Sequence, residues 1–260
     1  MELGRLGVWV SPRNIPEEQL GAGAALAERL GYGTFWLGMS PRLTALRPIL
    51  EATDRIVAAT GIVNIWTYEP ADLDAEFAAL DADFPGRILV GIGVGHRERT
   101  EQYAKPLTAM RTFLDGLDAL PPHRRCLAAL APKMLELSHR RALGAAPYFT
   151  PPEHTREARK LLGDGPLLAP ELAFALGDDP APAHEYAEGY LQLSNYRRNL
   201  ERFDADVDEV VPHGSAEHVA DIVRAHLDAG ADHVCVQALG EPGIPERGWS
   251  AVIEALRDAT

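Results

Sequence analysis

Cysteine is scarce in this chain of 260 residues, which contains only Cys126 and Cys235. Both lie in apolar, strand-like stretches, and neither has the spacing of a metal ligand. Disulfide frameworks belong mainly to small secreted proteins, so that class is excluded. We expect both cysteines to be buried free thiols.

Long apolar runs are absent as well. No stretch approaches the roughly 20 apolar residues that a helix needs to cross a bilayer. The first residues, Met1 to Arg5, lack the basic and apolar regions of a signal peptide. The sequence therefore predicts a cytoplasmic protein without a membrane partner.

Acidic residues outnumber basic ones. The chain has 38 aspartates and glutamates against 25 lysines and arginines, and its formal net charge is −13. Binding to a phosphate backbone requires a basic surface, so nucleic acid is excluded as a partner. The acidic residues are spread along the chain, which indicates a solvated surface and not a site for a cationic substrate. We expect a small-molecule substrate.

Apolar strand-like runs alternate with helical segments along the whole chain. Strands are expected at Leu6–Val10, Thr34–Leu37, Arg55–Trp66, Arg87–Gly93, Arg125–Leu130, Pro147–Thr150, Leu167–Ala169 with Leu172–Leu176, and His233–Leu239. Helices are expected at 16–30, from about Pro48, and at Pro70–Phe84, Leu107–Leu120, Pro132–Leu143, Pro152–Leu162, Pro182–Phe203, Ser215–Ala229 and Glu246–Ala259. Gly31, Gly144 and Gly230 are expected to end helices, and Ser215 to cap one.

Strict alternation of strand and helix gives a parallel sheet, and about eight such units in about 250 residues is the size of a TIM barrel. The predicted fold is a single α/β domain, a (β/α)8 TIM barrel over residues 1–260. An open, doubly wound sheet is the alternative, because the seventh strand is poorly marked.

The third expected strand, Arg55–Trp66, departs from a simple buried pattern. Gly61 interrupts its apolar run, and a glycine inside a strand marks a bulge or the close approach of a ligand. Asn64 and Trp66 add polar and aromatic groups at its carboxyl end. The segment is either a kinked buried strand or a platform for a flat ligand.

Chemistry in a TIM barrel belongs at the carboxyl ends of the strands. Those ends are rich in glycine and aromatic residues and poor in acids, and they contain neither a pair of carboxylates nor a His/Asp metal cluster nor a nucleophilic serine motif. Such a rim suits a planar cofactor that carries the chemistry itself. The sequence predicts no metal site.

Three short segments of this rim have competing interpretations. His96 is the best acid/base candidate by residue type, or an exposed loop histidine. Residues 130–133, Leu-Ala-Pro-Lys, could hold a phosphate at a helix start, or simply begin the helix. The glycines of Gly91-Ile-Gly-Val-Gly95 do not form the dinucleotide fingerprint, since His96 stands where it needs glycine.

Three motifs together resemble the luciferase-like monooxygenase superfamily. They are Ala-Thr-Gly-Ile-Val-Asn-Ile-Trp (59–66), Phe-Pro-Gly-Arg (84–87) and Gly-Ile-Gly-Val-Gly-His (91–96). Within it, the chain is similar to a branch described as probable coenzyme F420-dependent oxidoreductases. The resemblance implies a (β/α)8 barrel, often a homodimer, with a tricyclic ring at the carboxyl ends of the strands. It also implies a non-prolyl cis peptide at Gly61-Ile62 behind the ring.

The resemblance and the rim together define the expected site. The cofactor-binding candidates are Gly38, Met39, Ser40, Gly61, Ile62, Val63, Asn64, Gly93, Val94, Gly95, His96, Leu130, Ala131, Pro132 and Lys133, and the substrate-pocket candidates are Trp9, Trp36, Trp66, Tyr148 and Gln237. A side chain at Gly61 is expected to meet the ring. His96 is the catalytic candidate.

Two departures from the family pattern limit what can be carried over. Many relatives have an acid or histidine after the second strand, where this chain has Gly38-Met39-Ser40. Many also have a long insertion where this chain has only Pro121-Pro122-His123. The expected activity is hydride transfer between C5 of coenzyme F420 and an organic substrate. The alternatives are an FMN-dependent monooxygenase and a barrel that binds a flavin or deazaflavin without turnover.

Overall fold

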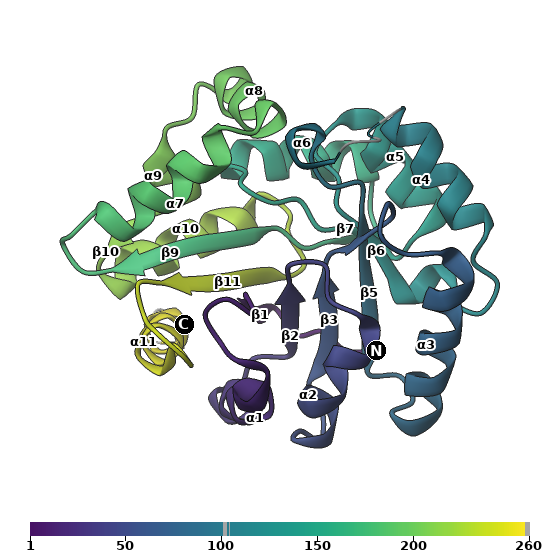
Figure 1. The fold of residues 1–260 in the computed structure, drawn as a ribbon. Coiled ribbons are helices and arrows are strands. Elements are labelled where there is room, and N and C mark those ends of the chain that lie inside the picture. The colour runs from purple at the N-terminus through teal and green to yellow at the C-terminus, as the bar shows by residue number, and fades with distance from the viewer. Residues whose placement is uncertain (101–102, 104, 258–260) are drawn as a thin grey trace.

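The computed structural model describes residues 1–100, 103 and 105–257. Parallel strands form an inner sheet and helices surround it (Figure 1). The strands are β1 Leu6–Val10, β2 Thr34–Gly38, β3 Val57–Gly61, β4 Val63–Asn64, β5 Ile88–Gly93, β6 Arg125–Leu127, β7 Gly144–Ala145, β8 Leu167–Leu168, β9 Glu171–Leu176, β10 His213–Gly214 and β11 Val234–Leu239. The α-helices are α1 Leu20–Leu30, α2 Arg47–Glu51, α3 Pro70–Asp83, α4 Pro106–Asp115, α5 Pro132–Arg141, α6 Pro152–Leu162, α7 Ala181–Leu191, α8 Ser194–Phe203, α9 Val207–Val210, α10 Ala216–Asp228 and α11 Glu246–Arg257.

The sheet closes on itself, which confirms the TIM-barrel fold and excludes the open sheet. Its order runs β10-β9-β11-β1-β2-β3-β5-β6-β7-β8. Residues Leu167–Leu176 close the ring, because β8 pairs with β7 while β9 pairs with β11. Pro170 lies between β8 and β9, and its carbonyl accepts a hydrogen bond from the Cys235 amide of β11 at 2.9 Å.

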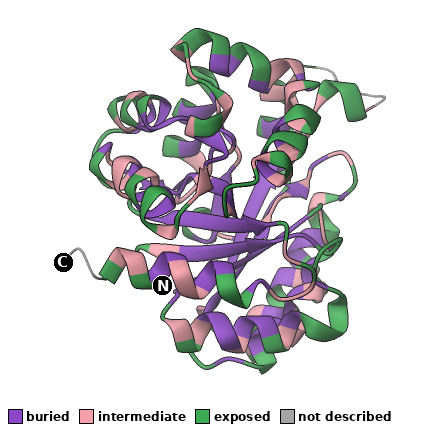
Figure 2. Cartoon of the chain, turned by 90° about the vertical axis from the view of Figure 1, so that its left-hand side faces the viewer, coloured by how far each residue is buried: buried purple, intermediate pink, exposed green. Residues whose placement is uncertain are grey.

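Alternation along the strands divides the core into two layers. Val8 and Val10 of β1 pack with the helices, whereas Trp9 belongs to an inner cluster that includes Trp36 and Cys126. Figure 2 shows the strands buried inside and the helices exposed on their outer faces. Both cysteines are buried free thiols, as expected. Among the described residues, no helix is long and apolar enough to cross a membrane.

Several helix ends confirm the expected signals. Gly31 ends α1 with φ 97°, a left-handed conformation that glycine adopts without steric cost. The Ser215 hydroxyl accepts a hydrogen bond from the His218 amide at 3.2 Å and caps α10. The helix expected at Pro152–Leu162 has those bounds in α6. The last helix is described to Arg257, so its expected end at Ala259 lies outside the described residues.

The strand expected at Pro147–Thr150 is wrong, because β7 lies earlier, at Gly144–Ala145. A Cβ on Gly144 would lie 1.9 Å from the Leu167 carbonyl oxygen, so this glycine permits the close approach of β8 and does not end a helix. Later in the chain, Tyr148 makes only an isolated bridge to Glu171.

The long helix expected at Pro182–Phe203 is two helices, α7 and α8, with a break at Gln192 and Leu193. Leu193 has extended backbone angles and is buried, so packing interrupts a helical sequence pattern there. The short elements α9 and β10 follow and were not expected.

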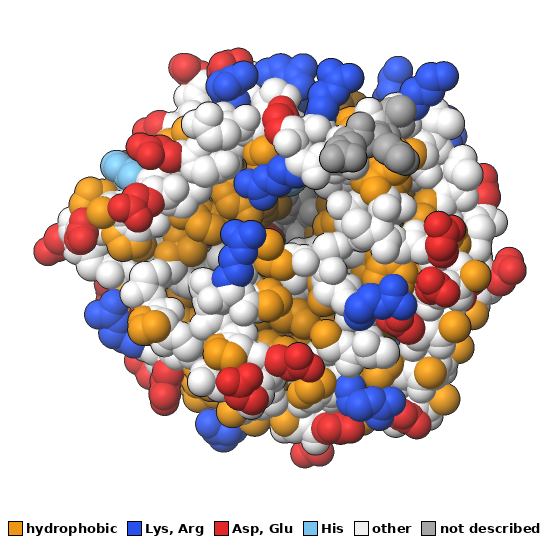
Figure 3. Space-filling view, in the orientation of Figure 1, with side chains coloured by type: hydrophobic (Ala, Val, Ile, Leu, Met, Phe, Trp, Pro, Cys, Tyr) orange, Lys and Arg blue, Asp and Glu red, His pale blue; other side chains and the backbone are white. Residues whose placement is uncertain are grey.

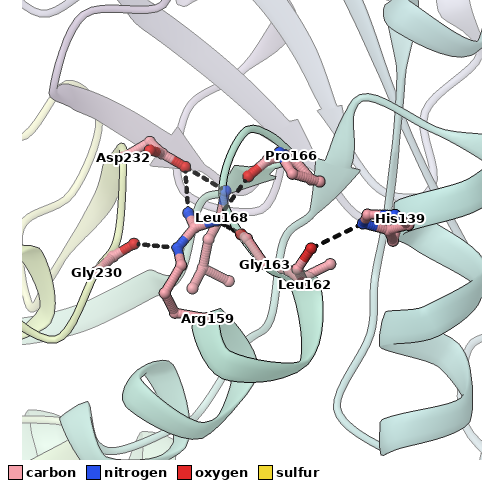
Figure 4. A network of polar contacts seen from close by, with 8 residues as sticks. All are labelled: His139, Arg159, Leu162, Gly163, Pro166, Leu168, Gly230 and Asp232. Carbon is pink, nitrogen blue, oxygen red and sulfur yellow. Dashed lines mark hydrogen bonds and ion pairs between the residues drawn. The ribbon is translucent and has the colours of Figure 1, made fainter.

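Polar contacts fasten the amino ends of the closing strands (Figure 4). Arg159 of α6 donates to the carbonyls of Gly230, Gly163 and Pro166 at 2.8–2.9 Å. It also pairs with Asp232 at 2.5 Å, and the same carboxylate accepts the Leu168 amide at 2.8 Å. One arginine therefore joins α6 to the segments that lead into β8 and β11.

Candidate functional site

The Gly61-Ile62 peptide is cis, as the family resemblance implied. It separates β3 from β4, and β4 continues the pairing with β5. A Cβ on Gly93 of β5 would lie 2.9 Å from the Ile62 side chain, so that glycine makes room for Ile62. The carboxyl ends of β3 and β5 thus adjoin, as the sequence predicted.

Trp9 of β1 fills the space beside two glycines. A Cβ on Gly38 would lie 1.9 Å from its ring, and a Cβ on Gly61 would lie 2.4 Å from its Nε1. The first neighbour of a side chain at Gly61 is therefore Trp9, and not only a bound ring as expected. The indole is 7% exposed, and its Nε1 has no hydrogen-bond partner.

The loop after β2 is joined to the loop after β4. Met39 and Ser40 have positive φ angles of 64° and 55°, and Met39 is 45% exposed. The Ser40 hydroxyl accepts the Asn64 amide at 2.9 Å, and the Asn64 side chain accepts the Trp66 amide at 3.0 Å. These bonds fix the edge of the site at the end of the third strand.

The turn after β5 approaches the same edge. Gly95 has φ 59°, which favours glycine, and a Cβ there would lie 2.9 Å from Nδ2 of Asn64, so a larger residue would displace that side chain. The Val94 carbonyl accepts the Trp66 indole at 2.8 Å. Trp66 also contacts the ring of Tyr103. The structure therefore brings residues 64–66 together with residues 93–96.

His96 is partly buried against α8, so the exposed-loop interpretation is wrong. Its ring lies 5.2 Å from that of Tyr196. Burial lowers the pKa of His96, while a hydrogen bond to Asn195 opposes this. Its Nδ1 is buried without a partner. His96 is consequently a neutral imidazole with one nitrogen available.

A tyrosine cluster, formed by Tyr148, Tyr186, Tyr190 and Tyr196, covers one side of the site. Its rings lie 4.9–5.7 Å apart across Tyr148–Tyr190, Tyr148–Tyr196, Tyr186–Tyr190 and Tyr190–Tyr196. The Tyr148 hydroxyl donates to Tyr186, which donates to the Gln237 side chain at 2.7 Å. Tyr148 and Gln237 were expected here, whereas the tyrosines of α7 and α8 were missed, because only tertiary packing places those helices.

Glu171 begins β9 and is the main functional candidate that sequence reasoning missed. Its register partner on β11 is Cys235, a member of the inner cluster. Its Oε1 is buried with no hydrogen-bond partner. Burial raises the pKa of Glu171 well above its usual range, which favours the neutral carboxyl. The expectation of an acid-free rim is therefore wrong. A single acid inside the apolar run Leu167–Leu176 was the available signal.

Three unpartnered polar atoms border this region, namely Trp9 Nε1, His96 Nδ1 and Glu171 Oε1. His96 contacts Tyr196 of the tyrosine cluster, and the electrostatic influence of Glu171 reaches Tyr148, Tyr186, Tyr190 and Tyr196. Figure 3 shows a hollow near the centre of this face, lined with hydrophobic side chains and flanked by basic ones. Buried polar groups normally have partners, so the set fits a ligand with an apolar body and polar edges, such as a flavin-like ring.

The start of α5 lies beside the site and is open to solvent. Ala131, Pro132 and Lys133 are exposed, and no side chain caps the helix. Leu130 and Pro132 line a shallow surface depression together with His154 and Arg202. Arg202 pairs with Glu157, which weakens its attraction for an anion. A phosphate-binding role for residues 130–133 stays a prediction.

Trp36 is buried more completely than a side chain that lines an open pocket would be. It is 3% exposed, and its indole nitrogen donates to the Thr34 hydroxyl at 2.9 Å. That hydroxyl also lies 2.9 Å from His233 Nε2. Trp36 thus belongs to the barrel interior, and its place in a substrate pocket stays a prediction.

The chain is similar to known proteins both in sequence and in fold. Residues 3–120 match the sequence pattern of the family described as luciferase-like monooxygenase. That segment contains β1 to β5 and the cis peptide. No curated protein sequence matches the chain.

Solved structures share the complete fold. The coenzyme F420-dependent tetrahydromethanopterin reductase from Methanopyrus kandleri is 17% identical, with a TM-score of 0.78 over 100% of this chain and 99% of that one. An F420-dependent secondary alcohol dehydrogenase in complex with an F420-acetone adduct is 16% identical, with a TM-score of 0.75 over 99% and 100%. The oxygenating constituent of 3,6-diketocamphane monooxygenase from Pseudomonas putida, in complex with FMN, is 12% identical, with a TM-score of 0.70 over 98% and 97%.

Proposed function

Residues 3–120 of this chain belong to the luciferase-like monooxygenase family, and from this premise we propose that the protein is an F420-dependent oxidoreductase. When bound, the deazaflavin donates or accepts a hydride at its C5, and the protein orients it against an organic substrate. The observation that carries the proposal is the group of unpartnered buried atoms at the carboxyl end of the barrel, Trp9 Nε1, His96 Nδ1 and Glu171 Oε1.

The residues that would hold the ring are those the structure gathers at this end. Gly61 and Ile62 at the cis peptide would support one side of it, and the turn Gly93–His96 would approach it with its backbone. The unpartnered Trp9 indole would donate a hydrogen bond to an acceptor on a bound molecule. These groups lie on strand ends, which hold them more precisely than free loops would.

Hydride transfer to a carbonyl-type substrate must be matched by a proton, and we assign Glu171 as the group that would supply it. Burial raises its pKa and so favours the protonated carboxyl, which has a proton to give. The pair Tyr148 and Tyr186, hydrogen-bonded to each other and to Gln237, lies within its electrostatic range. Glu171 would therefore give up the proton, and the tyrosine hydroxyls would orient the accepting oxygen.

The test is an anaerobic optical titration with reduced F420 and, separately, with FMN, followed by mixing with acetone as a probe. We expect saturable F420 binding and the return of the oxidised F420 spectrum. Tight FMN binding with oxygen consumption and no F420 binding would instead identify an FMN monooxygenase. F420 binding without oxidation by acetone or a panel of enones and quinones would identify a binding protein without turnover.

The protein acid is tested with Glu171→Gln. Loss of a general acid costs about 10²–10⁴-fold in rate, so turnover should fall by that factor while F420 affinity changes little. His96→Ala tests whether His96 is the proton donor instead. Glu153→Gln changes an exposed carboxyl in the same way and is the matched control. A turnover loss confined to His96→Ala would transfer the acid role to His96.

A further inference from the structure

Three potential metal ligands meet at the edge of the molecule, away from the residues of the candidate site. His184 of α7 and His213 of β10 both lie 3.3 Å from Oδ1 of Asp208 on α9. The ligand atoms of all three residues lie within 4.8 Å of one another. The sequence predicted no metal site, because the members of this cluster lie in three separate elements and the short ones, α9 and β10, were not expected.

The backbone holds each of these groups in place before any ion binds. Asp208 lies in α9, which a reciprocal capping box between Asp206 and Glu209 fixes at its start. His213 pairs with Ala175 in the sheet. His184 lies in the first turns of α7, and its backbone amide donates a hydrogen bond to the Pro180 carbonyl at 2.9 Å. Ion binding would therefore order little additional backbone.

Neither His–Asp contact is a short hydrogen bond, since His184 Nε2 and Asp208 Oδ1 make a long one at 3.3 Å. Charge-assisted N–H···O bonds are about 2.7–2.9 Å long, and both contacts are longer. His213 Nδ1 is buried and makes no hydrogen bond despite its proximity to Asp208. Ligands at about 2.0–2.1 Å from tetrahedral zinc are separated by about 3.3–3.4 Å, which matches both His–Asp distances.

The surroundings also suit a cation with one open position. The side chains of His184 and Asp208 are 49% and 52% exposed, so solvent can complete the coordination. The chain has a net charge of −13, and Glu185, Asp206 and Glu209 neighbour the ligands in sequence. Two imidazoles and one carboxylate are a donor set found in zinc sites, and the His–Asp distances match the tetrahedral geometry that zinc prefers. We propose that His184, Asp208 and His213 bind one Zn²⁺ ion per chain.

A bound ion would join α7 to the α9–β10 segment. The same helix carries Tyr186 and Tyr190 of the tyrosine cluster. Zinc would consequently steady one wall of the candidate site from the outside. The proposal does not depend on the proposed oxidoreductase activity, since it concerns ion binding alone.

The experiment is a calorimetric titration of the full chain with Zn²⁺, using untagged protein that has been treated with a chelator. We expect one site in the wild type. Loss of an outer-shell partner already weakens metal sites about 10–100-fold, so His184→Ala, His213→Ala and Asp208→Asn should each weaken binding at least as much. His218→Ala, which removes another exposed histidine, should bind zinc like the wild type.

Substitution with Co²⁺ adds a readout of geometry, because a four-coordinate site gives intense visible bands. Asp208→Asn is nearly isosteric and is not part of the capping box, and circular dichroism checks that each variant is folded. The proposal is supported if the wild type binds one zinc ion, the three ligand variants lose this binding, and the wild type loaded with Co²⁺ shows these bands. No binding by the wild type, or equal binding by His184→Ala and His218→Ala, overturns it.

Discussion

At the scale of single residues, the environment of Glu171 is unusual for a carboxyl group. It is a carboxyl in the barrel interior with an unpartnered oxygen, next to tyrosines and opposite Cys235. Burying a carboxylate without a partner is costly, so the group remains protonated instead. A residue that lowers stability in this way is typical of functional sites, where activity is retained at the expense of stability.

The pH dependence of stability should reveal this cost. Because the pKa of Glu171 is raised on folding, its stabilising contribution is complete below the unfolded pKa and is lost as the pH rises toward the folded pKa. Glu171→Gln cannot titrate, so it should gain stability over the wild type with rising pH. Each unit of pKa corresponds to about 1.4 kcal/mol, so the stability difference between Glu171→Gln and the wild type should widen measurably from pH 4.5 to pH 8.

Urea unfolding at pH 4.5, 6 and 8 measures this difference. The exposed Glu153→Gln should follow the wild-type curve throughout. A constant difference between Glu171→Gln and the wild type at all three pH values would show that the pKa of Glu171 is not raised on folding.

At the scale of elements, glycines decide how closely the strands and their side chains approach. Gly38 and Gly61 make room for Trp9, and Gly93 makes room for Ile62. The sequence predicted Gly61 as a special position, because a glycine interrupted a β-branched run. It could not predict that the occupant of the space is a tryptophan from β1, since strand pairing alone brings those residues together.

A double-mutant cycle tests the pairing of Gly61 with Trp9. Gly61→Ala places a methyl group 2.4 Å from the indole nitrogen and should cost about 1–3 kcal/mol of unfolding free energy. In a Trp9→Ala background the same change should cost little, because the crowded atoms are gone. Thermal and urea unfolding of the four proteins provide the measurement.

Gly189→Ala is the control, since a Cβ on this residue of α7 meets nothing within 4 Å. Alanine is the better helix former, so this variant should be more stable by about 0.5–1 kcal/mol. Equal losses from Gly61→Ala in both Trp9 backgrounds would mean that another neighbour of Gly61 opposes the substitution.

At the scale of the whole molecule, the two ends of the barrel have different roles. The carboxyl end holds the segments of the candidate site around the cis peptide, whereas the amino end holds the polar network around Arg159 (Figure 4). This division is typical of TIM barrels, in which one face carries the site and the other stabilises the fold. The homodimer and the single domain over residues 1–260 stay predictions.

Arg159→Met should separate these roles. It removes hydrogen bonds to three carbonyls and the pair with Asp232, and we expect a loss of roughly 2–4 kcal/mol in unfolding free energy. F420 affinity of the folded variant should remain as in the wild type. Arg140→Met breaks an exposed pair with Glu136 and should change stability by less than about 1 kcal/mol. Urea unfolding and coenzyme titration check both effects.

The sequence by itself determined the barrel and one half of the candidate site. Buried parallel strands are apolar throughout and their helices have one apolar face, so periodicity located most elements up to β6 and again from α10. The segments around Gly61 and Gly93 were predictable because their special residues are consecutive in the chain. The middle segments were misplaced where short strands carry no pattern of their own, as at Gly144–Ala145.

Only the tertiary structure decided the other half. Closure of the sheet through Leu167–Leu176 places Glu171 opposite Cys235, and the packing of α7 and α8 brings the tyrosines beside it. The convergence of His184, Asp208 and His213 likewise depends on three elements meeting. Periodicity encodes which face of an element is buried, but not which residues of distant elements become neighbours. The protonation of Glu171 depends on that neighbourhood, because desolvation is a property of the folded molecule.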